Sequence, residues 1–218
     1  MGQLVTVNHN ILCAVDVETT GLVPGVNEII ELCVLPLNAA LKPELSVETF
    51  NVKIRPEKLE EISPSALKVN GMKLDDLKFA MAKDDALALF ENWFDNEIKG
   101  KGYRQIEPLA QNWPFDLGFL LEFFGSYVDS TEDHQRYMDL FFFRGFRDTF
   151  STAKYINDLA EYNGLRIPFP KQNLRYLCAQ LNIEHIGAHT ALGDCHATAE
   201  VYKKMSSIYI KGGFKIVE

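Results

Sequence analysis

Two carboxylates occupy alternate positions in an apolar stretch near the start of the chain. The segment Ile11–Leu22 has the sequence ILCAVDVETTGL, and its apolar, Val-containing first half predicts a buried strand. Side chains alternate across a strand, so Asp16 and Glu18 should share one face, about 6.6 Å apart along it. Burying two negative charges on one face is costly unless a cation lies between them. The pair therefore predicts a site for a divalent metal ion.

Three further residues have types suited to the same chemistry, although each is unremarkable alone. Asp116 and Asp194 are expected in the first turns of two helices, where the helix dipole favours an acid. His189 precedes Asp194 by five residues, and a lone histidine is usually structural. Five residues correspond to about 140° around a helix. We therefore expect His189 on the loop or first turn, free to move over the metal site.

Taken together in chain order, three segments resemble the motifs of the DEDDh (DnaQ-like) 3′–5′ exonucleases. They are residues 16–21 (DVETTG), 112–116 (NWPFD) and 189–194 (HTALGD). The likeness extends from about Ile11 to Lys204 and includes EIIE at residues 28–31 and the pair Asp148-Thr149. The family includes proofreading subunits of DNA polymerases, ribonuclease T and oligoribonuclease.

The resemblance implies two divalent ions, Mg²⁺ or Mn²⁺, held by Asp16, Glu18, Asp116 and Asp194. Carboxylate oxygens suit such hard cations. In this two-metal scheme one ion activates a water molecule and the other stabilises the leaving 3′ oxygen. His189 would take the proton from the water, since imidazole titrates near neutral pH. Without cations the acids repel one another, so we expect the metal-free site to be loose or partly protonated.

The resemblance also implies the residues that contact the terminal nucleotide. Leu22 would wedge against its base, and Thr19 or Gly21 would bond its 3′ hydroxyl. Thr-Thr-Gly is equally typical of a turn that ends a strand. Asn112 and Phe115 match the His-Asn-x-x-Phe-Asp pattern common in the second motif.

The second motif departs from that pattern at Gln111, where histidine is frequent. Glutamine can still hydrogen-bond, so we expect changed contacts around the site rather than lost activity. Trp113 could stack on a base or belong to the core. The aromatic and basic run at residues 141–147 (FFFRGFR) has the same two interpretations, and we favour the core.

The elements around these motifs predict an α/β fold with strands first and alternating elements after. Strands are expected from Ile11 and over Ile29–Asn38, Leu45–Ile54, Ile106–Ala110 and Leu140–Phe146, and the last of these segments could also be helical. Helices are expected after Ser63 to Lys68, over Asp84–Ile98, Phe115–Phe124, Thr149–Tyr162, Asn173–Leu181 and Ala191–Ile210. The resemblance implies a ribonuclease H-like three-layer fold, a mixed central sheet of about five strands flanked by helices. We expect residues 1–218 to form a single exonuclease domain, with a surface insertion at Ser130–Tyr137. Glu31, inside the second strand, is either a satisfied edge residue or a partner of the site.

Bulk composition excludes several function classes. The 218 residues are 47% apolar and 24% charged, which is ordinary for a globular enzyme. A net charge of −8 argues against a protein that binds along the length of a nucleic acid by overall charge. It does not argue against an enzyme that binds a few nucleotides. With no membrane-length apolar run and no signal peptide, we expect no membrane partner. The cysteines form no CxxC pair, which favours a reducing, intracellular (cytoplasmic) location: Cys13, Cys33, Cys178 and Cys195.

The sequence thus predicts a metal-dependent 3′–5′ exonuclease that acts on single-stranded or frayed DNA or RNA and releases nucleoside 5′-monophosphates. One alternative is a catalytically weak nucleic-acid-binding or polymerase-associated proofreading module. Another is an unrelated metal phosphoesterase, which is disfavoured because histidine-rich ligands are missing. The expected partner is a nucleic acid 3′ end, while a DNA polymerase in trans and a homodimer remain open. No motif reports contacts to a 2′-hydroxyl, so DNA and RNA are not distinguished.

Overall fold

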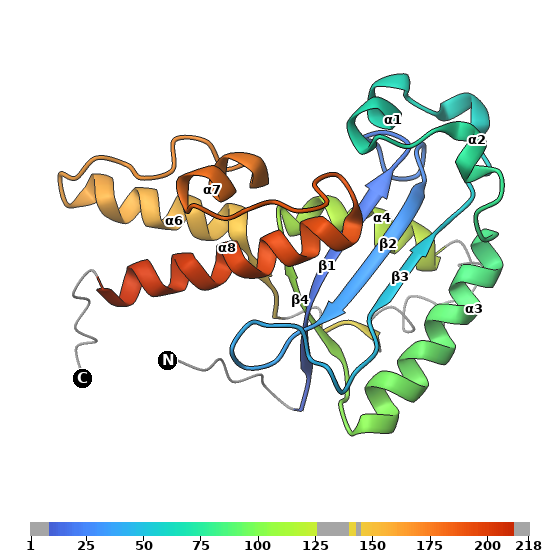
Figure 1. The fold of residues 1–218 in the computed structure, drawn as a ribbon, viewed down its shortest axis with the longest axis horizontal. Coiled ribbons are helices and arrows are strands. Elements are labelled where there is room, and N and C mark those ends of the chain that lie inside the picture. The colour runs from blue at the N-terminus through green and yellow to red at the C-terminus, as the bar shows by residue number, and fades with distance from the viewer. Residues whose placement is uncertain (1–8, 126–139, 143–144, 212–218) are drawn as a thin grey trace.

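A mixed five-stranded sheet forms the centre of the molecule (Figure 1). The computed structural model describes residues 9–125, 140–142 and 145–211. The strands, in the spatial order β3-β2-β1-β4-β5, are β1 (Ile11–Thr19), β2 (Ile29–Pro36), β3 (Phe50–Lys53), β4 (Ile106–Ala110) and β5 (Arg147–Asp148). The first three strands pair antiparallel, and β1, β4 and β5 run parallel. The predicted antiparallel opening and the mixed sheet are confirmed.

Helices follow β3 and alternate with the last two strands, and two of them begin at a side chain that caps the helix. They are η1 (Leu59–Glu61), α1 (Pro64–Asn70), α2 (Leu74–Leu77), α3 (Lys83–Trp93), α4 (Trp113–Gly125), α6 (Thr149–Tyr162), α7 (Leu174–Gln180) and α8 (Ala191–Lys211). The side chains of Asp148 and Asn173 accept hydrogen bonds from backbone N–H groups of α6 and α7, which satisfies donors left free at a helix start. Helix α3 continues as a π-type turn over Phe94–Ile98.

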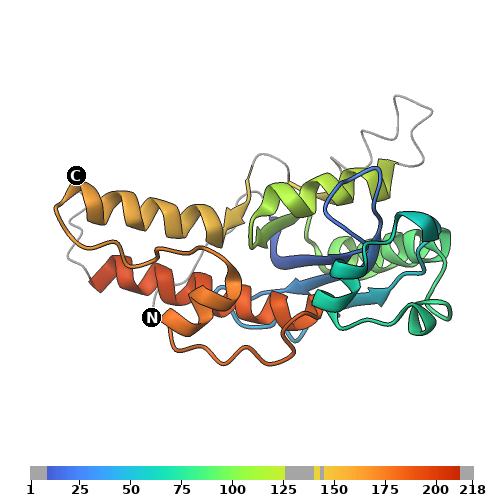
Figure 2. The same ribbon diagram turned by 90° about the horizontal axis from the view of Figure 1, so that it is seen from above.

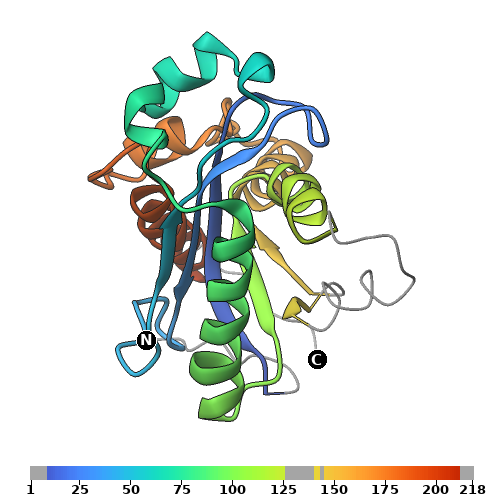
Figure 3. The same ribbon diagram turned by 90° about the vertical axis from the view of Figure 1, so that its right-hand side faces the viewer.

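The layers pack through the alternation of β1 side chains. Cys13, Val15 and Val17 face a core cluster with α3 and α4, whereas Leu12 and Ala14 face a second cluster with α8. Seen from above, α4 and α8 lie on opposite sides of the strands (Figure 2). Helices α6 and α7 pack against α8 through a third cluster. Helices α1 and α2 lie at the end of the sheet where β1 ends (Figure 3). The three-layer α/β fold expected from the sequence is therefore confirmed.

Two strand predictions are corrected. The third strand begins at Phe50 rather than Leu45, because the Glu44 carboxylate accepts hydrogen bonds from Ser46 and forms a turn there. The predicted strand Leu140–Phe146 is wrong over the residues of this segment that the structure describes, 140–142 and 145–146. Phe141 makes a single bridge to Ile106 and is fully buried in the core, and the fifth strand lies at Arg147–Asp148.

Other predicted elements match the observed bounds closely. The strand predicted at Ile106–Ala110 is confirmed, and helix α2 was not predicted. Residues 143–144 and the predicted insertion Ser130–Tyr137 lie outside the described residues. None of the described helices is both long and apolar enough to cross a membrane.

Candidate active site

Strand β1 carries the first two acids on the side of the sheet that α8 covers. By the alternation of the strand, Asp16 lies on the same face as Leu12 and Ala14. The side chains of Leu12 and Ala14 pack in a core cluster that includes residues of α8. Asp16 is partly exposed and Glu18 is buried. The register with β2 shifts between Glu18 and Thr19, and such an irregularity re-aims the side chains beside it.

Asp116 reaches β1 from the first turn of α4. Its Oδ1 accepts a hydrogen bond from the backbone N–H of Val17 at 3.2 Å. The turn before α4 has Asn112 at a φ of 68°, a left-handed conformation that asparagine tolerates. The Asn112 backbone N–H donates to Asp148 Oδ1 at 2.7 Å, so buried Asp148 fixes the turn that delivers Asp116.

Asp194 lies in the first turn of α8, and two histidines precede it on the adjoining loop. His189 is exposed, at a φ of 66°, and its backbone N–H donates to Asp194 Oδ1 at 3.2 Å. The same Oδ1 lies 2.7 Å from Nε2 of His185. Sequence reasoning did not single out His185. The one available signal was its position four residues before His189.

Carboxylate oxygens of Asp16, Glu18 and Asp194 all lie within 4.8 Å of one another. The pKa of Asp16 is raised well above its usual value, first by burial and then by the charges of Asp116, Asp194 and Glu18. Burial, Asp194 and Glu31 raise the pKa of Glu18 to about 8. The pKa of Asp116 is also raised, chiefly by burial.

These acids therefore resist ionisation unless positive charge is supplied. An all-oxygen donor set of this kind suits a hard divalent cation. The acidic cluster could hold such an ion.

Glu31 is a partner of this site rather than a satisfied edge residue. Its buried carboxylate accepts hydrogen bonds from the backbone N–H of Ala191 and the side chain of Asn51. Its Oε2 has no hydrogen-bond partner in the described part of the chain. Because Ala191 is the first residue of α8, Glu31 ties β2 to the helix turn that carries Asp194.

The segment after β1 forms a tight loop. The Thr19 hydroxyl donates to the carbonyl of Gly21 at 2.6 Å. A Cβ at Gly21 would overlap the side chain of Asn27, so a larger residue there would displace the hydrogen bond that Asn27 accepts from the Val23 N–H. Leu22 is 79% exposed, which leaves its side chain available at the surface. The turn interpretation of Thr-Thr-Gly holds, and the loop presents Leu22 to solvent.

The second motif combines buried and accessible side chains. Phe115 is partly buried, and the centroid of its ring lies 5.0 Å from that of the Phe119 ring. Asn112 is exposed. Trp113 is buried, so its core interpretation holds. Gln111 accepts a hydrogen bond from the Thr149 hydroxyl at 2.6 Å and donates to a backbone carbonyl at residue 172. Gln111 therefore joins the end of β4 to α6.

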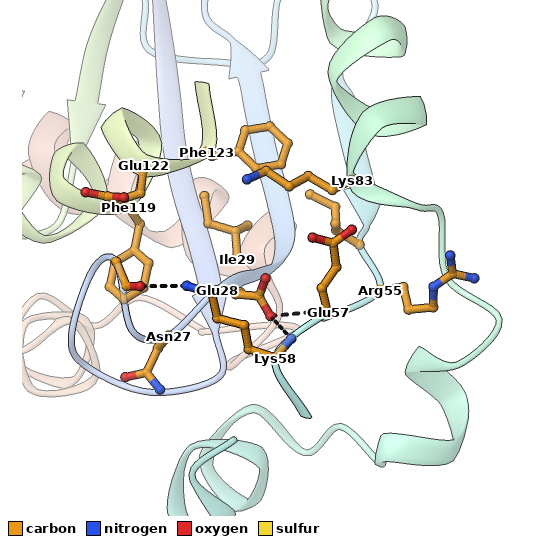
Figure 4. A pocket seen from close by; sticks show the side chains of 12 residues that line it. Asn27, Glu28, Ile29, Arg55, Glu57, Lys58, Lys83, Phe119, Glu122 and Phe123 are labelled. Atoms are coloured by element: carbon orange, nitrogen blue, oxygen red, sulfur yellow. Dashed lines mark hydrogen bonds between the residues drawn. The ribbon is translucent and has the colours of Figure 1, made fainter. Parts of the chain in front are cut away.

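A cavity of about 250 Å³ lies behind the 22–28 loop, between that loop, residues 54–58, Lys83 and α4 (Figure 4). Glu28 accepts from the backbone N–H groups of residues 57 and 58, and the Lys58 ammonium donates to the Gly25 carbonyl at 2.6 Å. Lys83 extends over the ring of Phe123. The four acids do not line this cavity. The bonds of Glu28 and Lys58 tether the loop that presents Leu22.

A family model described as Exonuclease (RNase_T) matches residues 13–202. This match spans all three motifs. The chain belongs to the Exonuclease family. The resemblance drawn from the motifs is therefore confirmed, and so is the class of enzyme, an exonuclease.

Several solved structures of nucleases have the same fold. The zinc-bound form of an E. coli ExoI–ssDNA complex has a TM-score of 0.68 at 18% identity, covering 94% of this chain and 42% of that one. Cell-death related nuclease 4 (CRN-4) has a TM-score of 0.65 at 16% identity, covering 91% and 64%. The nuclease domain of 3′hExo, a DEDDh family member bound to rAMP, has a TM-score of 0.61 at 21% identity, covering 94% and 95%. The chain thus spans less than two thirds of the first two proteins.

Proposed function

We propose that this family member is a metal-dependent 3′–5′ exonuclease that removes nucleotides from single-stranded or frayed nucleic acid. The observation that carries the proposal is the convergence of Asp16, Glu18 and Asp194 oxygens within 4.8 Å, with Asp116 close enough to raise the pKa of Asp16. Helix α8 packs against the sheet through one core cluster and against α6 and α7 through another. Because these clusters connect all of the layers, we also infer a single exonuclease domain.

Asp16, Glu18, Asp116 and Asp194 would hold two Mg²⁺ or Mn²⁺ ions. When bound, such ions lower the pKa of water and stabilise charge on the phosphate and the leaving 3′ oxygen. The residues of the chain hold the site in place. Val17 and Asp148 fix Asp116 from opposite sides, and Glu31 fixes the first turn of α8.

His189 would accept the proton of the attacking water. Its position supports this role: the side chain is exposed, and its own backbone N–H contacts Asp194 Oδ1. An exposed loop histidine can approach a bound substrate, and histidine is the side chain that most often serves as a general base. Cleavage of the phosphodiester bond then leaves the 3′ hydroxyl on the shortened strand and releases a nucleoside 5′-monophosphate.

The terminal nucleotide would lie across the loop after β1 and the start of α4. Exposed Leu22 would pack against the base, and the Thr19–Gly21 backbone would bond the 3′ hydroxyl. Asn112 and Phe115, from the second motif, would contact the nucleotide from the other side. The neighbours that contain ssDNA or rAMP in their structures support a nucleic acid substrate.

The direct test uses 5′-labelled single-stranded DNA, RNA and dinucleotides, each incubated with Mg²⁺, Mn²⁺ or a chelator. The expected result is a ladder that shortens from the 3′ end only when metal is present, with 5′-monophosphates as products. A 3′-phosphate on the substrate serves as a block. Binding of these strands without release of nucleotides, in every metal, would instead identify a nucleic-acid-binding module.

A further inference from the structure

A histidine outside the three motifs contacts the acidic cluster directly. Nε2 of His185 lies 2.7 Å from Oδ1 of Asp194. An ionised carboxylate can only accept a hydrogen bond, so Nε2 carries the hydrogen in that state. Both side chains are mostly buried, with 13% and 18% of their surfaces exposed. A charge-assisted bond in such a setting holds its partner more firmly than a surface contact does.

Two donors meet on the same oxygen of Asp194. The backbone N–H of His189 also bonds Oδ1, at 3.2 Å. Both donors use Oδ1, so Oδ2 is left to bind a metal ion. The carboxylate rotamer is then set by the loop before α8 rather than by the helix alone.

We propose that His185 is a positioning residue that orients the Asp194 carboxylate toward Asp16 and Glu18. This inference rests on the proposed metal-dependent function. In this role His185 acts through its contact with Asp194. Hydrogen-bond partners of metal-binding groups commonly change metal affinity by about 10- to 100-fold when removed.

The test is a Mn²⁺ titration of the full chain, made metal-free with chelator, followed calorimetrically in the absence of nucleic acid. His185→Leu and the smaller His185→Ala remove the donor, and His185→Gln retains an N–H of similar reach. His196→Leu is the matched control, because His196 is exposed on α8. Circular dichroism and thermal melting establish that each variant is folded.

The expected result is Mn²⁺ affinity lower by about 10- to 100-fold in His185→Leu and His185→Ala, largely restored in His185→Gln and unchanged in His196→Leu. Wild-type affinity, or tighter binding, in both donor-free variants would overturn the positioning role alone. A wild-type protein that neither binds Mn²⁺ nor hydrolyses nucleic acid would overturn the proposed function as well, so the two failures are distinguishable.

Discussion

The carboxylate of Asp116 accepts a hydrogen bond from the backbone N–H of Val17, although 99 positions separate the two residues. Strand β4 pairs with β1 only as far as Leu109 opposite Ala14. The N–H of Val17 lies beyond that pairing, and the Asp116 side chain takes the place that a strand carbonyl would have. Asp116 therefore supports the sheet independently of any metal ion.

Replacing Asp116 should separate these two roles. Asp116→Asn keeps an acceptor for Val17 and removes one negative charge, so we expect a melting temperature at or above that of the wild type. Its nuclease rate should fall by at least about 100-fold. Asp116→Leu should lose the rate and also about 1–3 kcal/mol of unfolding free energy, because a buried N–H loses its partner. Equal destabilisation in both variants would contradict the structural role.

The first turn of α8 is packed closely against the loop that carries His189. A Cβ at Gly193 would overlap the carbonyl oxygen of Gly187. Gly193→Ala should therefore displace both His189 and Asp194, and a shift near 1 Å lowers activity by about 100-fold. The measurement is the initial rate at saturating metal. Gly100→Ala, where the nearest atom lies 3.3 Å away, is the control and should keep wild-type activity.

Loss of the His189 imidazole should impair proton transfer and leave metal binding intact. We expect His189→Ala to lower the hydrolytic rate by about 100-fold or more. His189→Asn is the matched variant, because asparagine tolerates the positive φ at this position. Since the contact to Asp194 comes from the backbone N–H, Mn²⁺ affinity should change little in either variant. A large loss of affinity would identify His189 as a metal ligand.

The raised pKa of Glu18 predicts a specific pH dependence of stability in the metal-free protein. Folding raises this pKa from 4.5 to about 8, so the folded state binds the proton more tightly than the unfolded state. Stability is then fully present below pH 4.5 and is lost as the pH rises through about 8. Thermal melting in chelator should show this decline, and Glu18→Gln should reduce it. Identical slopes in the two proteins would contradict the pKa shift.

The sequence predicted most of the sheet and the Asp16–Glu18 pair because these depend on local regularities, whereas Asp116 and Asp194 were assigned only through the resemblance of the three motifs. Strand alternation placed Asp16 and Glu18 on one face, and an apolar run bounded by polar residues located β4 correctly. The predicted strand at 140–146 failed for a physical reason. Phe141 fills the core between helices, and a short apolar sequence has no period that distinguishes a strand from another buried segment.

Long-range contacts were not predictable from the sequence. Glu31 bonds Ala191 and His185 bonds Asp194 only because the chain folds back across the sheet. A lone histidine or glutamate has no local pattern that names its partner. Sequence reasoning left Glu31 between two interpretations and did not single out His185, and the tertiary structure provides both contacts.

Asp16→Asn provides the most direct test of the carboxylate cluster as a metal-dependent catalytic centre. The substitution is nearly isosteric and removes charge from the residue whose pKa is raised by all three other acids, so the variant should fold at least as stably as the wild type. Nucleotide release from a 5′-labelled single strand is measured for both proteins across a Mn²⁺ titration. We expect metal-dependent release by the wild type and a loss of about 1,000-fold in the folded variant. Equal release by the two proteins, or release that persists in chelator, would contradict it.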